Sequence, residues 1–276
     1  MGKTFQARRL TRHYSAYSVD PLFPPVAIRS LLKSCVSEAY QFEEKDFQLA
    51  LRIQSDLNNL RGNPHVVKLL HLFETPMEIL SITEVVNGTI EEYQGWIAST
   101  CLVQNIFKQI VAGYANLRAV GFYHCNLSAK TVFLQLKPSE ENPGIPEILA
   151  KIAGFEQAVA VSSDGGFVVG ESRVCGECSY AAPECFGDGF RADQADVWSL
   201  GVILFFLLTG EVPFNIANES DELFWMFKRN GFDAIAEELE EVHANPQAVE
   251  LLRRVFVVDP MERITFEELR NCVYVL

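Results

Sequence analysis

The chain has 276 residues, of which 49% are hydrophobic and 21% are charged, and this balance is typical of a soluble globular protein with a large core. Its formal net charge of −13 argues against nucleic acid or anionic membrane as the main partner, because neither would attract it. Seven cysteines spread over the chain favour reduced thiols over a disulfide framework.

No apolar signal-peptide core follows the N-terminus. The most apolar run, 197–208, is too short to span a bilayer and suits a buried core helix. We therefore expect a soluble, cytoplasmic chain without membrane insertion. A secreted form whose targeting segment has been removed stays open, because a cleaved segment leaves no trace in the sequence.

The first part of the chain predicts a small unit of strands and one helix. Segments 5–11 and 14–19 are plausible strands, and the apolar run Val26-Ala27-Ile28-Arg29 suits a buried strand. A helix is predicted over 44–61, because leucine and isoleucine recur along one side at helical spacing. A further strand is expected over 79–86.

Asn87-Gly88 is a turn signal, and we place a boundary there that divides the chain into 1–86 and 87–276. The segment 101–120 has apolar residues at helical spacing and predicts a long helix. Residues 138–146 hold three prolines and are expected to form an exposed loop that joins two strands. The second part is therefore expected to be mainly helical.

Four short motifs in the C-terminal part are the most specific features of the sequence. They are Tyr-Ala-Ala-Pro-Glu at 180–184, Asp-Val-Trp-Ser-Leu-Gly at 196–201, Pro-Phe at 213–214 and Asp-Pro-Met-Glu-Arg-Ile-Thr at 259–265. In this order they resemble the closing motifs of the protein kinase superfamily. The amino acids of these motifs are most similar to those of the calcium/calmodulin-dependent and calcium-dependent kinases. The resemblance implies an α+β fold of two lobes, with a small β-rich N-lobe and a larger helical C-lobe.

Two earlier runs, 122–134 and 151–156, resemble the catalytic loop H-R-D-x-x-x-x-N and the metal-binding motif D-F-G of the same family. The apolar residues of both motifs match the family pattern, but the residues at the catalytic and metal-binding positions differ. The resemblance places the catalytic aspartate, the phosphate-steadying lysine, the metal-binding asparagine and the metal-binding aspartate at Asn126, Ser128, Thr131 and Gly154. An amide oxygen is a far weaker base than a carboxylate.

The N-terminal part departs from the family pattern in the same way. Arg29 stands where the resemblance implies a phosphate-binding lysine, and Ile53 stands where it implies the paired glutamate. No glycine occurs between residues 5 and 25, so a glycine-rich phosphate loop is missing there. Glu177 replaces the threonine of the G-T-x-x-Y segment.

Taken together, these departures lead us to expect a catalytically inactive pseudokinase that is not an enzyme and carries no metal or cofactor, with Mg-ATP binding lost. The nucleotide pocket would survive only as a vestige, at Ala27, Thr83, Glu84 and Phe133. The resemblance also implies residues that keep a structural role. These are the apolar spine Leu57, Leu69, His124 and Phe155, its anchor Asp196, and a buried charge pair of Glu184 with Arg263.

A preserved frame with a lost active site favours a protein-binding scaffold or an allosteric regulator, with an active kinase as the expected partner. The alternative is an unconventional serine/threonine kinase or a nucleotide-binding switch. That alternative would use Glu156 as metal ligand and Arg29 for phosphates. Both hypotheses stay open at the level of sequence.

Overall fold

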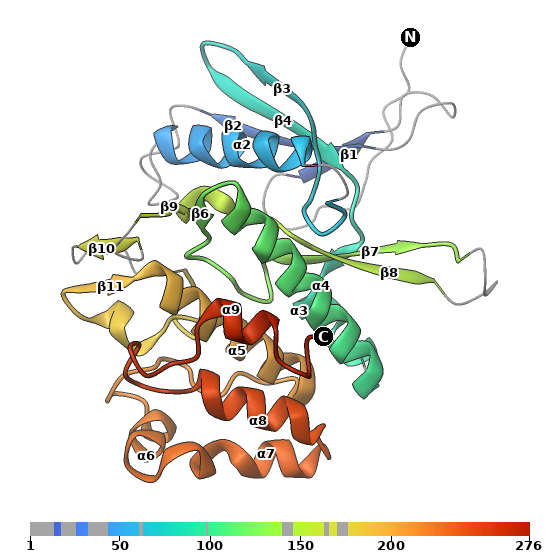
Figure 1. The fold of residues 1–276 in the computed structure, drawn as a ribbon. Helices are drawn as coiled ribbons and strands as arrows, with labels where there is room; N and C mark the ends of the chain where they lie inside the picture. The colour runs from blue at the N-terminus through green and yellow to red at the C-terminus, as the bar shows by residue number, and fades with distance from the viewer. Residues whose placement is uncertain are drawn as a thin grey trace.

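The computed structural model describes residues 14–17, 26–32, 44–60, 63–97, 99–139, 146–162, 166–169 and 176–276. Figure 1 shows two lobes, an upper one in which strands pack on helix α2 and a lower one built mainly of helices. The expected α+β class with a small β-rich N-lobe and a larger helical C-lobe is confirmed.

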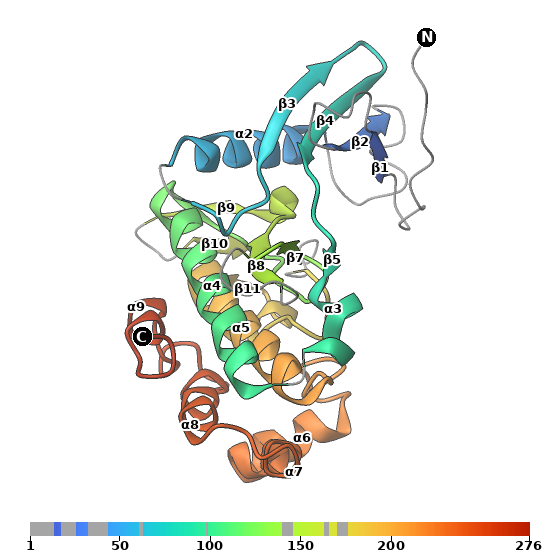
Figure 2. The same ribbon diagram turned by 90° about the vertical axis from the view of Figure 1, so that its right-hand side faces the viewer.

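The N-lobe is a four-stranded antiparallel sheet in the order β1-β2-β4-β3. Its elements are β1 (Tyr14–Tyr17), β2 (Val26–Leu32), α2 (Glu44–Asn59), β3 (Leu69–Glu74) and β4 (Glu78–Glu84). The segments 14–19, 26–29 and 79–86 do contain strands, as the sequence predicted, and β2 runs three residues further than its apolar run. The segment 5–11 lies outside the described residues. Figure 2 shows the β3–β4 hairpin projecting beyond α2.

The C-lobe is organised around its two longest helices, α4 and α5, which lie side by side (Figures 1 and 2). Its helices are α3 (Ile90–Tyr93), α4 (Thr100–Ala119), α5 (Ala192–Thr209), α6 (Glu222–Asn230), α7 (Ala236–Glu241), α8 (Pro246–Val255) and α9 (Phe266–Arg270). Within the described residues, α5 is the one helix long and apolar enough to cross a membrane, and 83% of that stretch is buried inside the protein. It therefore has the burial of a core helix.

Among the described residues, the C-lobe also holds three small sheets. The first joins β5 (Gly88–Thr89), β7 (Val132–Lys137) and β8 (Glu147–Ile152), the second joins β6 (Phe122–Tyr123) and β9 (Val159–Ala160), and the third joins β10 (Phe167–Val169) and β11 (Gly189–Arg191). The β7–β8 pair flanks the predicted loop 138–146, so its two strands are confirmed. The β10–β11 pairing was not predicted.

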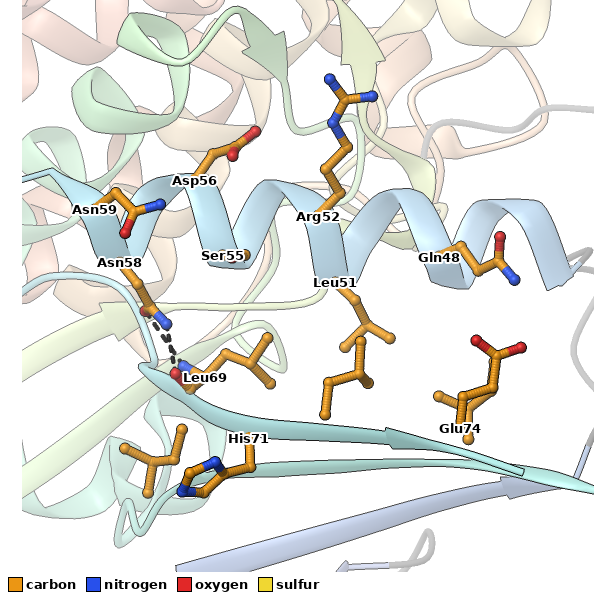
Figure 3. A pocket seen from close by; sticks show the side chains of 13 residues that line it. Gln48, Leu51, Arg52, Ser55, Asp56, Asn58, Asn59, Leu69, His71 and Glu74 are labelled. Carbon is orange, nitrogen blue, oxygen red and sulfur yellow. Dashed lines mark hydrogen bonds between the residues drawn. The ribbon is translucent and has the colours of Figure 1, made fainter.

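Helix α2 is tied to the sheet by side-chain amides. Asn58 Nδ2 donates to the carbonyl oxygen of Leu69, and the N–H of Leu69 donates back to Asn58 Oδ1 at 3.3 Å (Figure 3). Gln54 Nε2 donates to the carbonyl of Val67 at 2.6 Å. A groove of about 460 Å³ opens beside these contacts, between α2 and β3, and Leu69 belongs to its lining. These amide hydrogen bonds fix α2 on the sheet.

We expect Asn58→Ala to lower the free energy of unfolding by about 1–3 kcal/mol, because two backbone groups of Leu69 lose their partners. Urea unfolding of the variant and of the parent measures this difference. Asn59→Ala is the matched control, since the neighbouring amide is exposed and its removal should change stability by less than about 0.5 kcal/mol. Equal effects of the two substitutions would contradict the proposed tie.

Candidate functional site

Asp196 of α5 organises the loop that follows β6. The carboxylate is fully buried and accepts hydrogen bonds from Tyr114 Oη at 2.8 Å, from the N–H of His124 at 2.6 Å and from the N–H of Cys125 at 2.8 Å. Cys125 has a φ of 55°, in the left-handed region that costs a non-glycine residue about 1–3 kcal/mol. The three hydrogen bonds therefore hold a strained backbone in place.

The buried groups of this loop have perturbed acidities. Burial raises the pKa of Asp196 to about 6, although its hydrogen bonds from His124 and Tyr114 oppose the rise. Burial also lowers the pKa of His124 to about 4. The imidazole is thus neutral near pH 7, its Nε2–H donates to the carbonyl of Ala153 at 3.1 Å, and its Nδ1 accepts from the N–H of Asn126 at 3.2 Å.

Acidification should act on these two groups in opposite directions. The pKa of His124 is depressed from 6.5 to about 4, so its contribution to stability is lost as pH falls through this window. The pKa of Asp196 is raised from 3.8 to about 6, so its contribution is present below 3.8 and is lost as pH rises through 6. Over the shared range the two effects offset each other.

The substitution His124→Phe removes the first effect and leaves the second. We expect the variant to gain stability relative to the parent when the pH is lowered from about 7 to about 4.5, because only the parent then has to keep an imidazole neutral. Urea unfolding at both pH values measures the change. A stability difference that does not vary with pH would show that His124 does not titrate as its burial requires.

In the loop after β6, the side chains of Ser128 and Thr131 form hydrogen bonds within the loop itself. The Thr131 hydroxyl accepts from the N–H of Ser128 at 3.0 Å and donates to the carbonyl of Asn126 at 3.0 Å. Ser128 is buried, and its hydroxyl accepts from the N–H of Lys130 at 3.3 Å. Gly154 has a φ of 86°, and a Cβ there would lie 3.0 Å from Thr131 Cγ2. A larger residue at this position would be strained.

An ion pair joins the N-lobe to the C-lobe across 127 positions of sequence. Arg29 Nη1 of β2 donates to Glu156 Oε1, which lies in the 3-10 helix Phe155–Gln157, at 2.5 Å. The Arg29 side chain is 28% exposed and the Glu156 side chain 10%. Ile53 of α2 is fully buried, so the helix contributes an apolar side chain at this point. The cation of β2 therefore has a carboxylate partner from the C-lobe.

The residues of the expected nucleotide pocket lie on facing strands. Ala27 is opposite Thr83 in the β2–β4 pair, and Phe133 is opposite Lys151 in the β7–β8 pair. Lys151 Nζ donates to Glu84 Oε1 at 2.8 Å, and its side chain is 6% exposed. Sequence reasoning missed this buried pair. The signal was present, since a lysine inside an apolar strand requires a carboxylate partner.

A second group of charged side chains surrounds Lys130, in the loop that follows β6. Lys130 Nζ is 2.5 Å from Glu177 Oε1 and 3.7 Å from Glu91 Oε1, and all three side chains are at least a third exposed. The hydrogen bond that Lys130 donates to Glu177 is the main cause that raises the pKa of Lys130, which stays charged. This group joins α3, the loop and the segment before α5.

The residues expected to be structural are buried or bonded. Leu57 and Leu69 are buried beside the sheet, and the rings of His124 and Phe155 have centroids 5.2 Å apart. Arg263 is bidentate to Glu184, with Nη1 to Oε1 at 2.7 Å and Nη2 to Oε2 at 2.9 Å. The expected charge pair of Glu184 with Arg263 is present in the structure.

The sequence matches the model of the protein kinase domain over residues 26–275. The chain belongs to the protein kinase family. It is 30% identical over 82% of its length to the SNF1-like protein kinase ssp2 of Schizosaccharomyces pombe, covering 37% of that protein. It is 28% identical over 94% of its length to the serine/threonine-protein kinase unc-51 of Caenorhabditis elegans, covering 29% of it. The chain thus spans about a third of the length of these relatives.

The prediction that this kinase-family chain is not an enzyme was wrong. The relatives carry the names of protein kinases, the maternal embryonic leucine zipper kinase of Xenopus laevis among them at 28% identity over 80% of the chain. Lys151 and Asp196 are buried charged residues of the matched kinase domain, Lys151 paired with Glu84 and Asp196 accepting three hydrogen bonds. That prediction counted the replaced family residues and did not consider the charge pairs that residues far apart in the sequence form, such as Arg29 with Glu156.

Other expectations stay predictions. These are the lobe boundary at residue 86, the special similarity to calcium-dependent kinases, the cytoplasmic location, the protein partner and the expected loss of Mg-ATP binding. Among the described residues no group of three or more histidine, cysteine, aspartate and glutamate side chains gathers to hold a metal ion.

Proposed function

We propose that this chain is an unconventional serine/threonine protein kinase whose nucleotide site uses Arg29 and Glu156. The proposal is carried by the 2.5 Å ion pair between these residues, which lies across the two lobes. The pair brings a cation and a carboxylate together, which supports a site for phosphates and a metal ion. The names of the relatives support phosphoryl transfer to serine or threonine.

Arg29 can serve the phosphates in place of a lysine. A guanidinium presents a planar fork of donors that matches phosphate oxygens, and it stays charged at every physiological pH. In the structure Nη1 of Arg29 donates to Glu156 Oε1, and the Arg29 side chain is still 28% exposed. A triphosphate therefore competes with the carboxylate for the same cation.

Glu156 supplies the carboxylate that a magnesium ion requires. Mg²⁺ in nucleotide sites is commonly held by one or two carboxylates together with substrate phosphates. Glu156 fits this demand, because its carboxylate lies next to the cation that would hold the phosphates. When bound, the ion would neutralise charge on the phosphates. The buried neutral His124 and the ion pair of Lys151 with Glu84 keep the surrounding backbone in place.

A nucleotide-binding switch is the second candidate, and the same ion pair favours it. The pair joins an N-lobe strand to a C-lobe segment, so its exchange for a phosphate contact would change how the two lobes are held together. Such a switch would bind ATP and respond in stability without transferring phosphate. The two candidates share the binding site and differ in turnover.

Thermal unfolding with ATP, in the presence and absence of Mg²⁺, tests the nucleotide site. At 100 times the dissociation constant, a ligand that binds only the folded state should add about 2.7 kcal/mol of stability. We expect Arg29→Met to weaken ATP binding about 10- to 100-fold, since hydrogen bonds to charged groups contribute about 1.5–3 kcal/mol. Glu156→Ala should abolish the additional effect of Mg²⁺.

The matched control is Lys228→Met, which removes one member of an exposed ion pair with Glu219. It should leave the ATP-dependent stabilisation unchanged, because α6 lies in the lower part of the C-lobe (Figure 1). No ATP-dependent stabilisation of the parent protein would overturn both candidates and uphold the earlier expectation that Mg-ATP binding is lost.

A further inference from the structure

The loop that resembles the kinase catalytic loop lacks the family's two charged residues, but a different pair of charged residues lies beside it. The family pattern gives it an aspartate at 126 and a lysine at 128, whereas this chain has Asn126 and a buried Ser128. A lysine and a glutamate stand close by instead. Lys130 lies in the same loop, Glu177 faces it from the segment before α5, and their charged atoms are 2.5 Å apart.

Glu177 is anchored next to Asn126. A Cβ on the preceding Gly176 would lie 2.6 Å from Asn126 Oδ1 and 2.9 Å from Asn126 Cα, so the two backbones are in close contact. The N–H of Gly176 donates to Gln157 Oε1 at 2.8 Å, and the carbonyl of Glu177 accepts from the N–H of Tyr180 at 2.9 Å. The backbone on both sides of the Glu177 carboxylate is therefore fixed.

We propose that Glu177 is the carboxylate that accepts the proton of the acceptor hydroxyl, with Lys130 positioning it; the inference rests on the proposed kinase function. In this step the hydroxyl oxygen of a serine or threonine forms a bond to the γ-phosphorus of a nucleoside triphosphate. The bond from that phosphorus to the bridging oxygen breaks, and the nucleoside diphosphate leaves with the electron pair. The hydroxyl proton passes to the Glu177 carboxylate, which is regenerated by release to water.

The exposure of the pair supports a role at the surface where a substrate arrives. The Glu177 side chain is 34% exposed and the Lys130 side chain 53%. Exposed ion pairs of this kind contribute little to stability, so folding alone gives a weak reason for placing them here. Asn126, in contrast, offers the acceptor hydroxyl an amide that cannot take up a proton at neutral pH.

Steady-state phosphorylation of a serine- or threonine-containing acceptor by the parent and three variants tests this role. We expect Glu177→Gln to lower kcat about 10²-fold or more while KM for ATP stays the same, because general-base catalysis contributes about 10²–10⁴-fold. The double variant Asn126→Asp with Glu177→Gln should regain most of the lost rate, since it returns a carboxylate to the neighbouring residue. Glu91→Gln is the matched control and should leave kcat unchanged, although Glu91 also faces Lys130.

The outcomes separate this inference from the function on which it rests. A parent protein that transfers phosphate together with a fully active Glu177→Gln overturns the role of Glu177 and leaves the kinase function standing. A Glu177→Gln variant that loses activity but is not rescued by Asn126→Asp assigns Glu177 a purely structural role, and also overturns the inference. A parent protein that transfers no phosphate would overturn both the proposed kinase function and the role of Glu177.

Discussion

Arg263→Met is expected to lower the free energy of unfolding by about 3–5 kcal/mol, the typical cost of removing one partner of a buried ion pair. Its guanidinium side chain is fully buried, holds both oxygens of Glu184, and donates to the carbonyls of Val257 and Gln194. It also lies over the ring of Trp198 at 5.0 Å. Methionine leaves the Glu184 carboxylate and two carbonyls without these donors.

Chemical unfolding monitored by tryptophan fluorescence measures this loss. The control is Arg270→Met, which removes an arginine from an exposed pair with Glu267 whose charged atoms are 3.5 Å apart. Surface pairs contribute about 0–1 kcal/mol, so this variant should stay close to the parent. If the two substitutions cost the same, the Glu184–Arg263 pair does not stabilise the C-lobe as its geometry implies.

Asp196→Asn should have the second large effect, a loss of about 3 kcal/mol together with a strong loss of activity. The amide nitrogen of asparagine cannot accept, so at least one of the three donors that meet the carboxylate is left without an acceptor. The strained backbone at Cys125 is then free to relax out of the left-handed region. Both unfolding and phosphorylation assays report the change.

Tyr114→Phe separates the two parts of that effect. It removes the hydrogen bond from the hydroxyl to Asp196 but leaves both backbone donors in place, so we expect about 1 kcal/mol of destabilisation and most of the activity retained. A Tyr114→Phe variant as inactive as Asp196→Asn would contradict the view that the backbone bonds to His124 and Cys125 hold the loop.

The sequence predicted the framework because the framework follows local rules. Periodic apolar residues predicted a helix at 101–120 and the structure has α4 at Thr100–Ala119. The turn residues around the loop 138–146 likewise separated two strands that do pair. The buried Glu184–Arg263 pair followed from spaced motifs that the family shares. Each of these depends on short-range patterns or on a known order of motifs.

The two ion pairs of the candidate site join residues far apart in the chain, and no local pattern encodes them. Arg29 and Glu156 are 127 positions apart, and Lys130 and Glu177 are 47 positions apart. Read singly, Arg29 and Glu177 were interpreted as replaced family residues, and Glu156 was assigned a role only in the alternative hypothesis. Their pairing is visible only in three dimensions, which is why the sequence favoured an inactive protein and the comparisons with kinases did not.

The central claim is phosphoryl transfer through a site built on Arg29 and Glu156. The most direct measurement is incorporation of radiolabelled γ-phosphate into a serine- or threonine-containing acceptor by the purified chain, run beside Glu156→Ala and Arg29→Met. We predict metal-dependent incorporation by the parent and its loss in both variants. No incorporation by the parent, or equal incorporation by all three proteins, would contradict the claim.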